Sequence, residues 1–311
     1  MKKQFISLLI LLITGTGLFA QNVKLSVADI TALTTQDEGI FFYPKLTPDG
    51  QSVLFTGPHF QGLYVLNLSD KTITLLNRDE GAGYEYQISA DGKSVFYRAA
   101  TFKNHKKYYT LKEQNLSNRS SRILESEIRE MTPPQIFKGR LTYLKNAEVV
   151  QRILTQNLQK KRVQNIGAVF VGDRNMLLIN NGERKEMAPL GEGLYLWPHL
   201  SPDGQKIVFT FGGDATYVCD LDGNILSKIG YANAPVWSPD GKWIVYMVDH
   251  DNGDYFTDSE IFISSADGKQ KIQVTDTPDI IEMYPSWGAK LNQLVFASNR
   301  GQIFMAILKT E

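Results

Sequence analysis

The stretch Trp197-Pro198-His199-Leu200-Ser201-Pro202-Asp203-Gly204 ends in a tight turn, and the apolar triplet Ile207-Val208-Phe209 follows it. Proline presets φ near −65° in such a turn, serine hydrogen-bonds the turn backbone, and glycine takes the position with positive φ. The chain must therefore reverse between two strands. The same turn and triplet recur at three other places: Thr47-Pro48-Asp49-Gly50 with Val53-Leu54-Phe55, Ser89-Ala90-Asp91-Gly92 with Val95-Phe96-Tyr97, and Ser238-Pro239-Asp240-Gly241 with Ile244-Val245-Tyr246.

Two weaker copies of the unit fit the same frame, one at Gly139 with Thr142-Tyr143-Leu144 and one at Leu291 with Leu294-Val295-Phe296. A column of residues six places before the turn glycine, or before its equivalent, supports this count. The column consists of Pro44, Tyr86, Pro133, Pro198, Pro235 and Pro285. Proline is tolerated at the start of a strand, where a missing N–H is least harmful. The pattern predicts six repeated units.

Repeats of about 40–50 residues that each contain several short strands are typical of β-propeller blades. Radial packing of similar sheets buries both faces of each sheet against its neighbours and leaves only short edges. We therefore predict an all-β, six-bladed β-propeller. The segment from Gly167 to Leu190 contains apolar runs typical of strands but neither the proline nor the Asp-Gly turn, and we assign it to an irregular fourth blade. Seven blades remain the alternative.

The last unit supplies only three strands before the chain ends, whereas Val23 to Leu33 precedes the first complete unit and is strand-like. We expect this N-terminal strand to complete the last blade. The mature chain, residues 21–311, is then a single propeller domain.

The repeat of aromatic-Pro-x-apolar-Ser-Pro-Asp-Gly and an apolar strand resembles the WD-repeat-like units of TolB-type propellers. Related units occur in the propellers of dipeptidyl peptidase and prolyl oligopeptidase enzymes. The resemblance covers the mature chain and implies the propeller fold. Proteins similar in this way include periplasmic partners of other proteins, propellers that gate hydrolases, and some oligosaccharide lyases. Fold-level similarity does not choose among these functions.

The first twenty residues have the layout of a cleavable signal peptide. Lys2 and Lys3 form a basic start, Phe5 to Ile13 an apolar stretch, and Ala20 ends a small-residue exit after which we expect cleavage. The apolar stretch is shorter than the ~20 residues that span a bilayer. We therefore expect a periplasmic or secreted protein that is not membrane-spanning, and a monomer.

Composition narrows the classes of partner. The chain carries 33 Lys plus Arg and 33 Asp plus Glu. Without a field of one sign, nucleic acid is not expected as a partner. Cys219 is the single cysteine, so no intrachain disulfide can form, and its apolar context predicts a buried thiol. No G-x-S-x-G nucleophile elbow occurs in the sequence, which argues against a serine peptidase.

Strand order predicts which loops share a face. If the proline column opens the innermost strands, the loops that lead into those strands lie with the loops between second and third strands, on the face opposite the Asp-Gly turns. Loops on a rigid scaffold commonly carry binding residues. The expected ligand-binding residues of this loop face and channel mouth are Tyr43, His59, Tyr84, Trp197, His199, Glu282, Tyr284 and Arg300.

The acidic hairpin around Asp249-His250-Asp251-Asn252-Gly253-Asp254 is the sharpest local feature. Asp249, Asp251, Asp254 and Glu260 could supply oxygen ligands to a hard cation such as Ca²⁺. A solvated hairpin tip held by Asx turns is the other interpretation, and it is the one we favour. Otherwise no cofactor is expected.

These patterns predict an exported, non-enzymatic module that binds a protein or peptide partner in the cell envelope through the loop face and channel mouth. The alternative is a metal-assisted enzyme that binds or cleaves oligosaccharides with the same face. No catalytic residue is assigned.

Overall fold

The repeated turn is closed by its own side chains. In the computed structural model, which describes residues 25–154 and 166–310, Ser201 Oγ donates to Asp203 Oδ1 at 2.5 Å and accepts from Lys206 N at 2.9 Å. Asp203 Oδ1 also accepts from Gln205 N, and Gly204 has a φ of 79°. Thr47, Ser89 and Ser238 make the same bonds in their turns. The motif therefore serves the hairpin itself.

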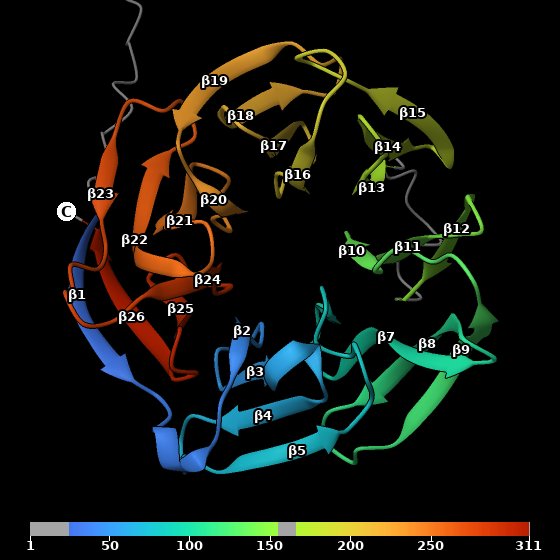
Figure 1. Ribbon diagram of the computed structural model, residues 1–311, viewed down its shortest axis with the longest axis horizontal. Coiled ribbons are helices and arrows are strands. Elements are labelled where there is room, and N and C mark those ends of the chain that lie inside the picture. The colour runs from blue at the N-terminus through green and yellow to red at the C-terminus, as the bar shows by residue number, and fades with distance from the viewer. Residues whose placement is uncertain (1–24, 155–165, 311) are drawn as a thin grey trace, which may run out of the picture.

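Seven antiparallel sheets surround a common axis (Figure 1). We number them as blades 1 to 7 in chain order. The strands of blades 1 to 3 are β2 Phe42–Leu46, β3 Ser52–Thr56, β4 Leu63–Asn67 and β5 Ile73–Asn77; β6 Gln87–Ile88, β7 Ser94–Lys103, β8 Lys106–Asn115 and β9 Ser121–Ile128; and β10 Gln135–Phe137, β11 Arg140–Lys145 and β12 Glu148–Ile153.

Blades 4 to 7 continue around the ring. Their strands are β13 Ile166–Val171, β14 Met176–Asn180 and β15 Glu183–Met187; β16 Tyr195–Leu200, β17 Lys206–Phe211, β18 Ala215–Asp220 and β19 Ile225–Gly230; β20 Asn233–Trp237, β21 Trp243–Asp251, β22 Phe256–Ser265 and β23 Lys271–Gln273; and β24 Glu282–Trp287, β25 Gln293–Ser298, β26 Ile303–Thr310 and β1 Leu25–Ala32.

The expectation of six blades is wrong, and the alternative of seven is confirmed. The segment assigned to an irregular fourth blade forms a sheet of its own, β13-β14-β15. The turn between its first two strands, residues 172–175, has neither the proline nor the Asp-Gly pair, and Gly172 N donates to Asn175 O at 2.8 Å there. The next hairpin, β14–β15, turns at Asn181 and Gly182, with φ values of 53° and 80°. Two consecutive residues of positive φ are the mark of a type I′ hairpin turn. This blade therefore closes by different local chemistry, which the repeat motif does not detect.

Closure of the ring by the N-terminal strand is confirmed. β1 pairs antiparallel with β26 from Leu25 opposite Thr310 to Ala32 opposite Phe304. Beyond the strand, Thr34 Oγ1 accepts from Ile303 N at 2.9 Å. Residues 1–20 and the expected cleavage after Ala20 lie outside the described residues.

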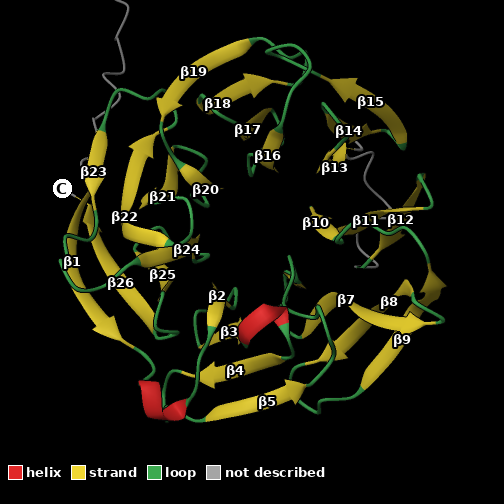
Figure 2. Ribbon diagram, in the orientation of Figure 1, coloured by secondary structure: helices red, strands yellow, loops and turns green. Residues whose placement is uncertain are grey.

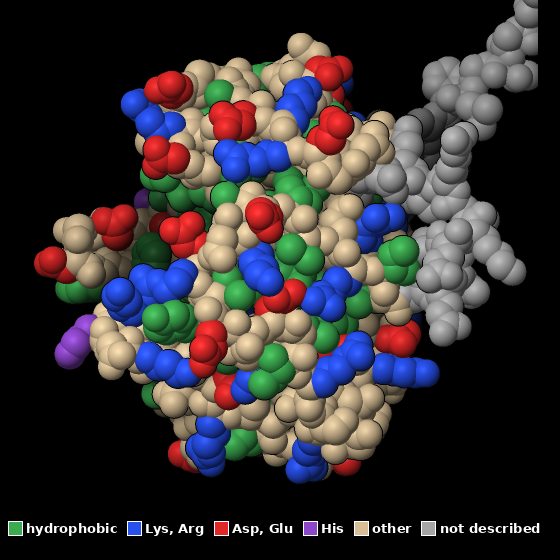
Figure 3. Space-filling model, turned by 90° about the vertical axis from the view of Figure 1, so that its right-hand side faces the viewer, with side chains coloured by type: hydrophobic (Ala, Val, Ile, Leu, Met, Phe, Trp, Pro, Cys, Tyr) green, Lys and Arg blue, Asp and Glu red, His purple; other side chains and the backbone are tan. Residues whose placement is uncertain are grey.

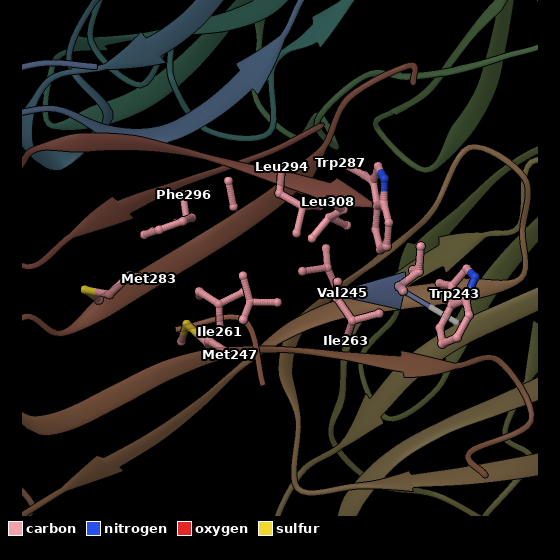
Figure 4. Packing of buried hydrophobic residues seen from close by; sticks show 13 residues of the cluster. Trp243, Val245, Met247, Ile261, Ile263, Met283, Trp287, Leu294, Phe296 and Leu308 are labelled. Atoms are coloured by element: carbon pink, nitrogen blue, oxygen red, sulfur yellow. The ribbon is translucent and has the colours of Figure 1, made fainter. Parts of the chain in front are cut away.

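The core is distributed between neighbouring blades. Between blades 6 and 7, Trp243, Val245 and Ile263 face Trp287 and Leu294 across the interface (Figure 4). Burial of such apolar surface contributes about 25 cal/mol per Å². Cys219 belongs to another cluster of this kind, as the sequence predicts, and burial raises the pKa of its thiol to about 12.

Helix is nearly absent from the described part of the chain. The two short 3-10 helices, η1 Gln36–Glu38 and η2 Pro58–Phe60, both adjoin blade 1 (Figure 2). Across residues 25–154 and 166–310, no helix has the length and apolar character needed to cross a membrane.

Candidate functional site

The innermost strands carry a repeated backbone distortion. In five of the seven blades, the residue that precedes the proline column has a left-handed φ: Tyr43 at 52°, Glu85 at 51°, Trp197 at 46°, Ala234 at 48° and Tyr284 at 53°. In four of these blades the strand register shifts at the same point, as in a β-bulge. A left-handed conformation costs a non-glycine residue about 1–3 kcal/mol, so the surrounding structure must hold it.

These bulges line a central cavity of about 420 Å³, which we call the channel mouth. It is built from two tiers that flank the proline column. The upper tier is Tyr43, Glu85, Trp197, Ala234 and Tyr284, and the lower tier, two residues further on, is Lys45, Gln87, His199, Val236 and Ser286. All ten come from blades 5, 6, 7, 1 and 2, which are consecutive around the ring. Phe60, from η2, and Tyr84 complete the aromatic rim.

Aromatic rings are in contact along one side of the channel mouth. The ring of Tyr43 stacks on Tyr284 with centroids 3.9 Å apart, and Phe60 lies 4.7 Å from Tyr43. Phe60 in turn meets Tyr84 edge-on at 5.1 Å. Burial, followed by a hydrogen bond with Tyr284, raises the pKa of Tyr43. The rim thus presents a preformed, uncharged aromatic surface beside the opening.

The lower tier contains a lysine and a histidine, Lys45 and His199, and the charge of the lysine acts on the histidine. Lys45 Nζ donates to Tyr86 O at 2.7 Å, and burial lowers its pKa to about 8, with Glu85 acting in the opposite direction. Enclosure by the channel walls, and then the charge of Lys45, lower the pKa of His199. The His199 side chain is nevertheless exposed to the channel, and this exposure moderates the lowering, so the neutral imidazole is the favoured form at pH 7.

Blade 2 has tyrosine where the other regular blades have proline. Tyr86 is fully buried, and its hydroxyl lies 2.9 Å from Tyr43 O and 2.8 Å from Leu54 O. The Tyr86 side chain therefore supports the strained Tyr43 backbone of the neighbouring blade. This contact links two blades at the point where the aromatic rim begins.

The structure brings together five of the eight expected ligand-binding residues, Tyr43, Tyr84, Trp197, His199 and Tyr284, in the channel mouth. His59 lines an adjoining groove with Phe60 and Tyr84. Arg300 is exposed at the β25–β26 turn and lines neither cavity. Sequence reasoning missed Lys45 and Glu85. The sequence does contain a signal for both residues: the upper tier is the residue before the recurring proline, or its equivalent, and the lower tier is the residue after it.

Glu282, the first residue of β24, is buried between blades 6 and 7, where Ser259 of β22 donates to its backbone oxygen at 2.6 Å. It is 1% exposed, and its Oε1 accepts from Thr277 Oγ1 at 2.5 Å. Glu260 Oε1 accepts from Thr277 N at 2.8 Å, so one threonine serves both carboxyl groups. Within the described residues, the Oε2 atoms of both glutamates are buried without a hydrogen-bond partner. Burial, opposed by Thr277 and reinforced by Glu260, raises the pKa of Glu282 to about 7.

The four proposed Ca²⁺ ligands have separate local roles. Asp249 Oδ1 accepts from Asn233 Nδ2 at 2.7 Å, and Asp251 Oδ1 accepts from Gly253 N at 2.8 Å in an Asx turn. Asp254 is exposed, and Glu260 bonds Thr277. Over residues 25–154 and 166–310, no three His, Cys, Asp or Glu side chains are grouped so that they could hold a metal ion. Calcium binding at this hairpin stays a prediction.

The fold and channel mouth define a propeller with a loop-lined central opening, and solved structures share this architecture. Oligogalacturonate lyase from Vibrio parahaemolyticus is 15% identical, with 92% of this chain and 96% of that chain covered and a TM-score of 0.56. A putative TolB from Agrobacterium tumefaciens is 17% identical, with coverages of 93% and 99% and a TM-score of 0.55. The Cps50 (Swd1) propeller domain of Myceliophteria thermophila is 10% identical, with coverages of 91% and 99% and a TM-score of 0.56.

These likenesses confirm the TolB-type β-propeller at the level of the fold. No protein-family model matches the chain, and no curated protein matches it. Identities this low identify an architecture that hosts many functions.

Proposed function

We propose that the chain is an exported, non-enzymatic module that holds an extended protein or peptide segment of a cell-envelope partner at the channel mouth. The observation that carries this proposal is the left-handed backbone shared by five innermost strands, because backbone strain concentrates at functional sites. None of the five left-handed positions is occupied by glycine, the residue that adopts this conformation without strain. Tyr43, Trp197 and Tyr284 are bulky residues that suffer the strain while lining the cavity.

The chemistry of the two tiers suits a peptide. Rigid aromatic rings supply contact area at a small loss of conformational entropy, as they do in binding sites generally. Below them, Gln87 and Ser286 offer hydrogen-bonding groups to a peptide backbone. The opening of about 420 Å³ accommodates a few side chains of a segment rather than a folded domain.

Affinity capture from envelope extract tests the proposal. We expect the double variant Tyr43→Ala/Tyr284→Ala to lose at least tenfold in affinity for the captured partner, because truncation of a central aromatic anchor typically costs about 2 kcal/mol. Ile123→Ala is the matched control, since Ile123 is 63% exposed on the outer strand β9. Equal enrichment of the same proteins by wild type and the double variant would contradict the proposal.

Export is tested by the N-terminus of the protein recovered from cells. Intact mass spectrometry is expected to show a chain that begins at Gln21, with the protein in the periplasm or the medium. A full-length chain in the cytoplasm would contradict export.

A second candidate is an enzyme that acts on acidic oligosaccharides, and the pair Lys45 and His199 favours it. A lysine with a pKa of about 8 beside a neutral imidazole is suited to proton transfer near neutral pH. One structural neighbour is described as an oligogalacturonate lyase in complex with manganese. Incubation with oligogalacturonate, with and without Mn²⁺, discriminates the two candidates. Unsaturated products that disappear in Lys45→Ala would establish the enzyme, and unchanged substrate would favour the binding module.

A further inference from the structure

A groove of about 300 Å³ on blade 2 adjoins the channel mouth. It shares Phe60 and Tyr84 with the mouth and extends outward over the β7–β8 hairpin, where Arg98, Lys107 and Tyr109 form its walls. A ligand that leaves the mouth over the aromatic rim therefore passes directly into this groove.

Cations and aromatic rings alternate along the groove. The guanidinium carbon of Arg98 lies 5.3 Å from the centre of the Tyr84 ring and 4.4 Å from that of Tyr109. Lys107 Nζ lies 5.3 Å from the same Tyr109 ring and 5.8 Å from the ring of Phe102. The row of contacts therefore continues from the stacked Tyr43 and Tyr284 of the mouth to the tip of the hairpin.

Arg98 is half-buried and Lys107 is exposed, and the charge of the nearby Glu85 carboxyl acts on Arg98. Arg98 donates to Met131 O, and in the described part of the chain neither Arg98 nor Lys107 lies within salt-bridge distance of a carboxylate. Another cation over an aromatic ring is different, since Lys228 over Tyr217 is paired with Asp214 at 3.0 Å. Burial lowers the pKa of Arg98, as expected for a guanidinium that has lost part of its hydration. A charge-assisted hydrogen bond to an anion would replace the hydration that the guanidinium has lost.

The charges around the groove set the sign of its ligand. Glu80 lines the groove, and Glu85 lies at its boundary with the mouth. Outward along the hairpin the balance becomes positive, with Lys103, Lys106, Lys107 and Arg129 against Glu127 and Glu130. In Figure 3, Lys and Arg side chains are interspersed with Asp and Glu side chains over the whole face shown. Across the ring, the β21–β22 hairpin on blade 6 carries Asp251 and Asp254 instead.

We propose that the groove formed by Arg98, Lys107 and Tyr109 binds an acidic side chain of the peptide segment whose neighbouring part occupies the channel mouth. This inference rests on the proposed function and specifies its partner as a segment with Asp or Glu next to its anchoring residues. The planar guanidinium pairs with a carboxylate through two parallel N–H donors, whereas Lys107 acts as a point charge beside it.

Fluorescence anisotropy with two labelled random copolymers of equal length tests the inference, one of glutamate and tyrosine and one of lysine and tyrosine. We expect the acidic copolymer to bind at least tenfold more tightly, and Arg98→Gln/Lys107→Gln to abolish that preference. The control is Arg78→Gln/Lys71→Gln, which removes the same charge from exposed positions that do not line the groove. It is expected to keep most of the preference.

Two sets of results would overturn the inference. One is equal binding of the two copolymers, or equal loss in the groove variant and the control, which would indicate a general charge effect. The other is tighter binding of an acidic oligosaccharide with the same dependence on Arg98. The proposed function is tested separately by Tyr43→Ala/Tyr284→Ala. If that variant loses the captured partner while the groove variant retains it, the mouth stands as the binding site and the groove does not.

Discussion

Blades 5, 6, 7, 1 and 2 form a regular arc, and blades 3 and 4 complete the ring with fewer strands and without the left-handed bulge at the proline column. Both regions bury full interfaces, as Tyr143 in blade 3 and Ile179 in blade 4 show. Only the arc lines the channel mouth. Packing between blades therefore closes the ring, whereas the left-handed residue before the proline column is what the five blades that present side chains to the axis have in common.

The largest effect is expected where the arc meets the irregular pair. Glu125 of β9 accepts from Lys145, Arg152 and Tyr143, all of blade 3. Burial alone would raise the pKa of Glu125, but these donors lower it to about 2. Its stabilising contribution is therefore complete above the unfolded pKa of about 4.5 and is lost as pH falls through 2.

We expect Glu125→Gln to lower the free energy of unfolding by about 2 kcal/mol at pH 7, since the partly exposed partners weaken the ion pairs. Denaturant unfolding at pH 7 and at pH 3 measures this loss, which should shrink at the lower pH. A loss that is equal at both pH values would show that the carboxylate charge is not what joins blades 2 and 3.

Within the arc, the buried Glu282 has the opposite pH dependence. Because its folded pKa is raised to about 7, its protonated form stabilises the fold fully below about 4.5, and this contribution is lost as pH rises through 7. We expect Glu282→Gln to raise the free energy of unfolding relative to wild type by about 1–2 kcal/mol at pH 8 and to change it little at pH 4. Glu80→Gln, at an exposed carboxyl, is the control for chemical denaturation at both pH values. A difference that does not depend on pH would contradict a buried, neutral Glu282.

A smaller loss is expected when an arc turn is broken. Ser238 is fully buried, and its Oγ accepts from Trp243 N at 2.9 Å. Ser238→Ala leaves that N–H without an acceptor and should lower the free energy of unfolding by about 1–2 kcal/mol. Ser238→Thr is the matched control, because Thr47 makes the same bonds in blade 1. An unchanged free energy of unfolding in the alanine variant would show that the serine side chain does not stabilise the turn.

The smallest expected effect is a gain in stability rather than a loss. Ala234 occupies the bulge of blade 6 with a φ of 48°, so Ala234→Gly removes a conformational strain that exceeds the entropy lost. We expect thermal unfolding to show a stabilisation of about 0.5–1 kcal/mol. The same change at Ala32, exposed and regularly paired with Phe304 on β1, should destabilise by a similar amount. Two changes of the same sign would mean that the bulge is not strained.

The sequence predicts the regular arc well because its turns are local. Ser, Asp and Gly satisfy one another within six residues, and closure by the N-terminal strand follows from counting strands in the last unit. Blade 4 was not counted as a unit of its own because the turn between its first two strands, residues 172–175, lacks the motif. A blade that is held to its neighbours only by apolar packing has no short sequence motif by which it can be recognised.

The channel mouth was predicted in part, because strand periodicity misplaces residues around a bulge. Glu282 and Tyr284 are two residues apart, which in a regular strand places both side chains on one face. The left-handed φ of Tyr284 redirects its side chain into the mouth, while Glu282 stays buried between blades. Lys45 and Glu85 flank the proline column and become recognisable only once that column is known to surround an axis.

Photo-cross-linking from the channel mouth tests the central claim most directly. A photoreactive phenylalanine analogue placed at Tyr284, and separately at Ile123 on the outer surface of blade 2, is irradiated in cells, and the adducts are identified by mass spectrometry. We expect one partner segment to be cross-linked from position 284, and only background yield from position 123. Equal yields from the two positions, or adducts from position 123 alone, would contradict a binding site at the mouth of the ring.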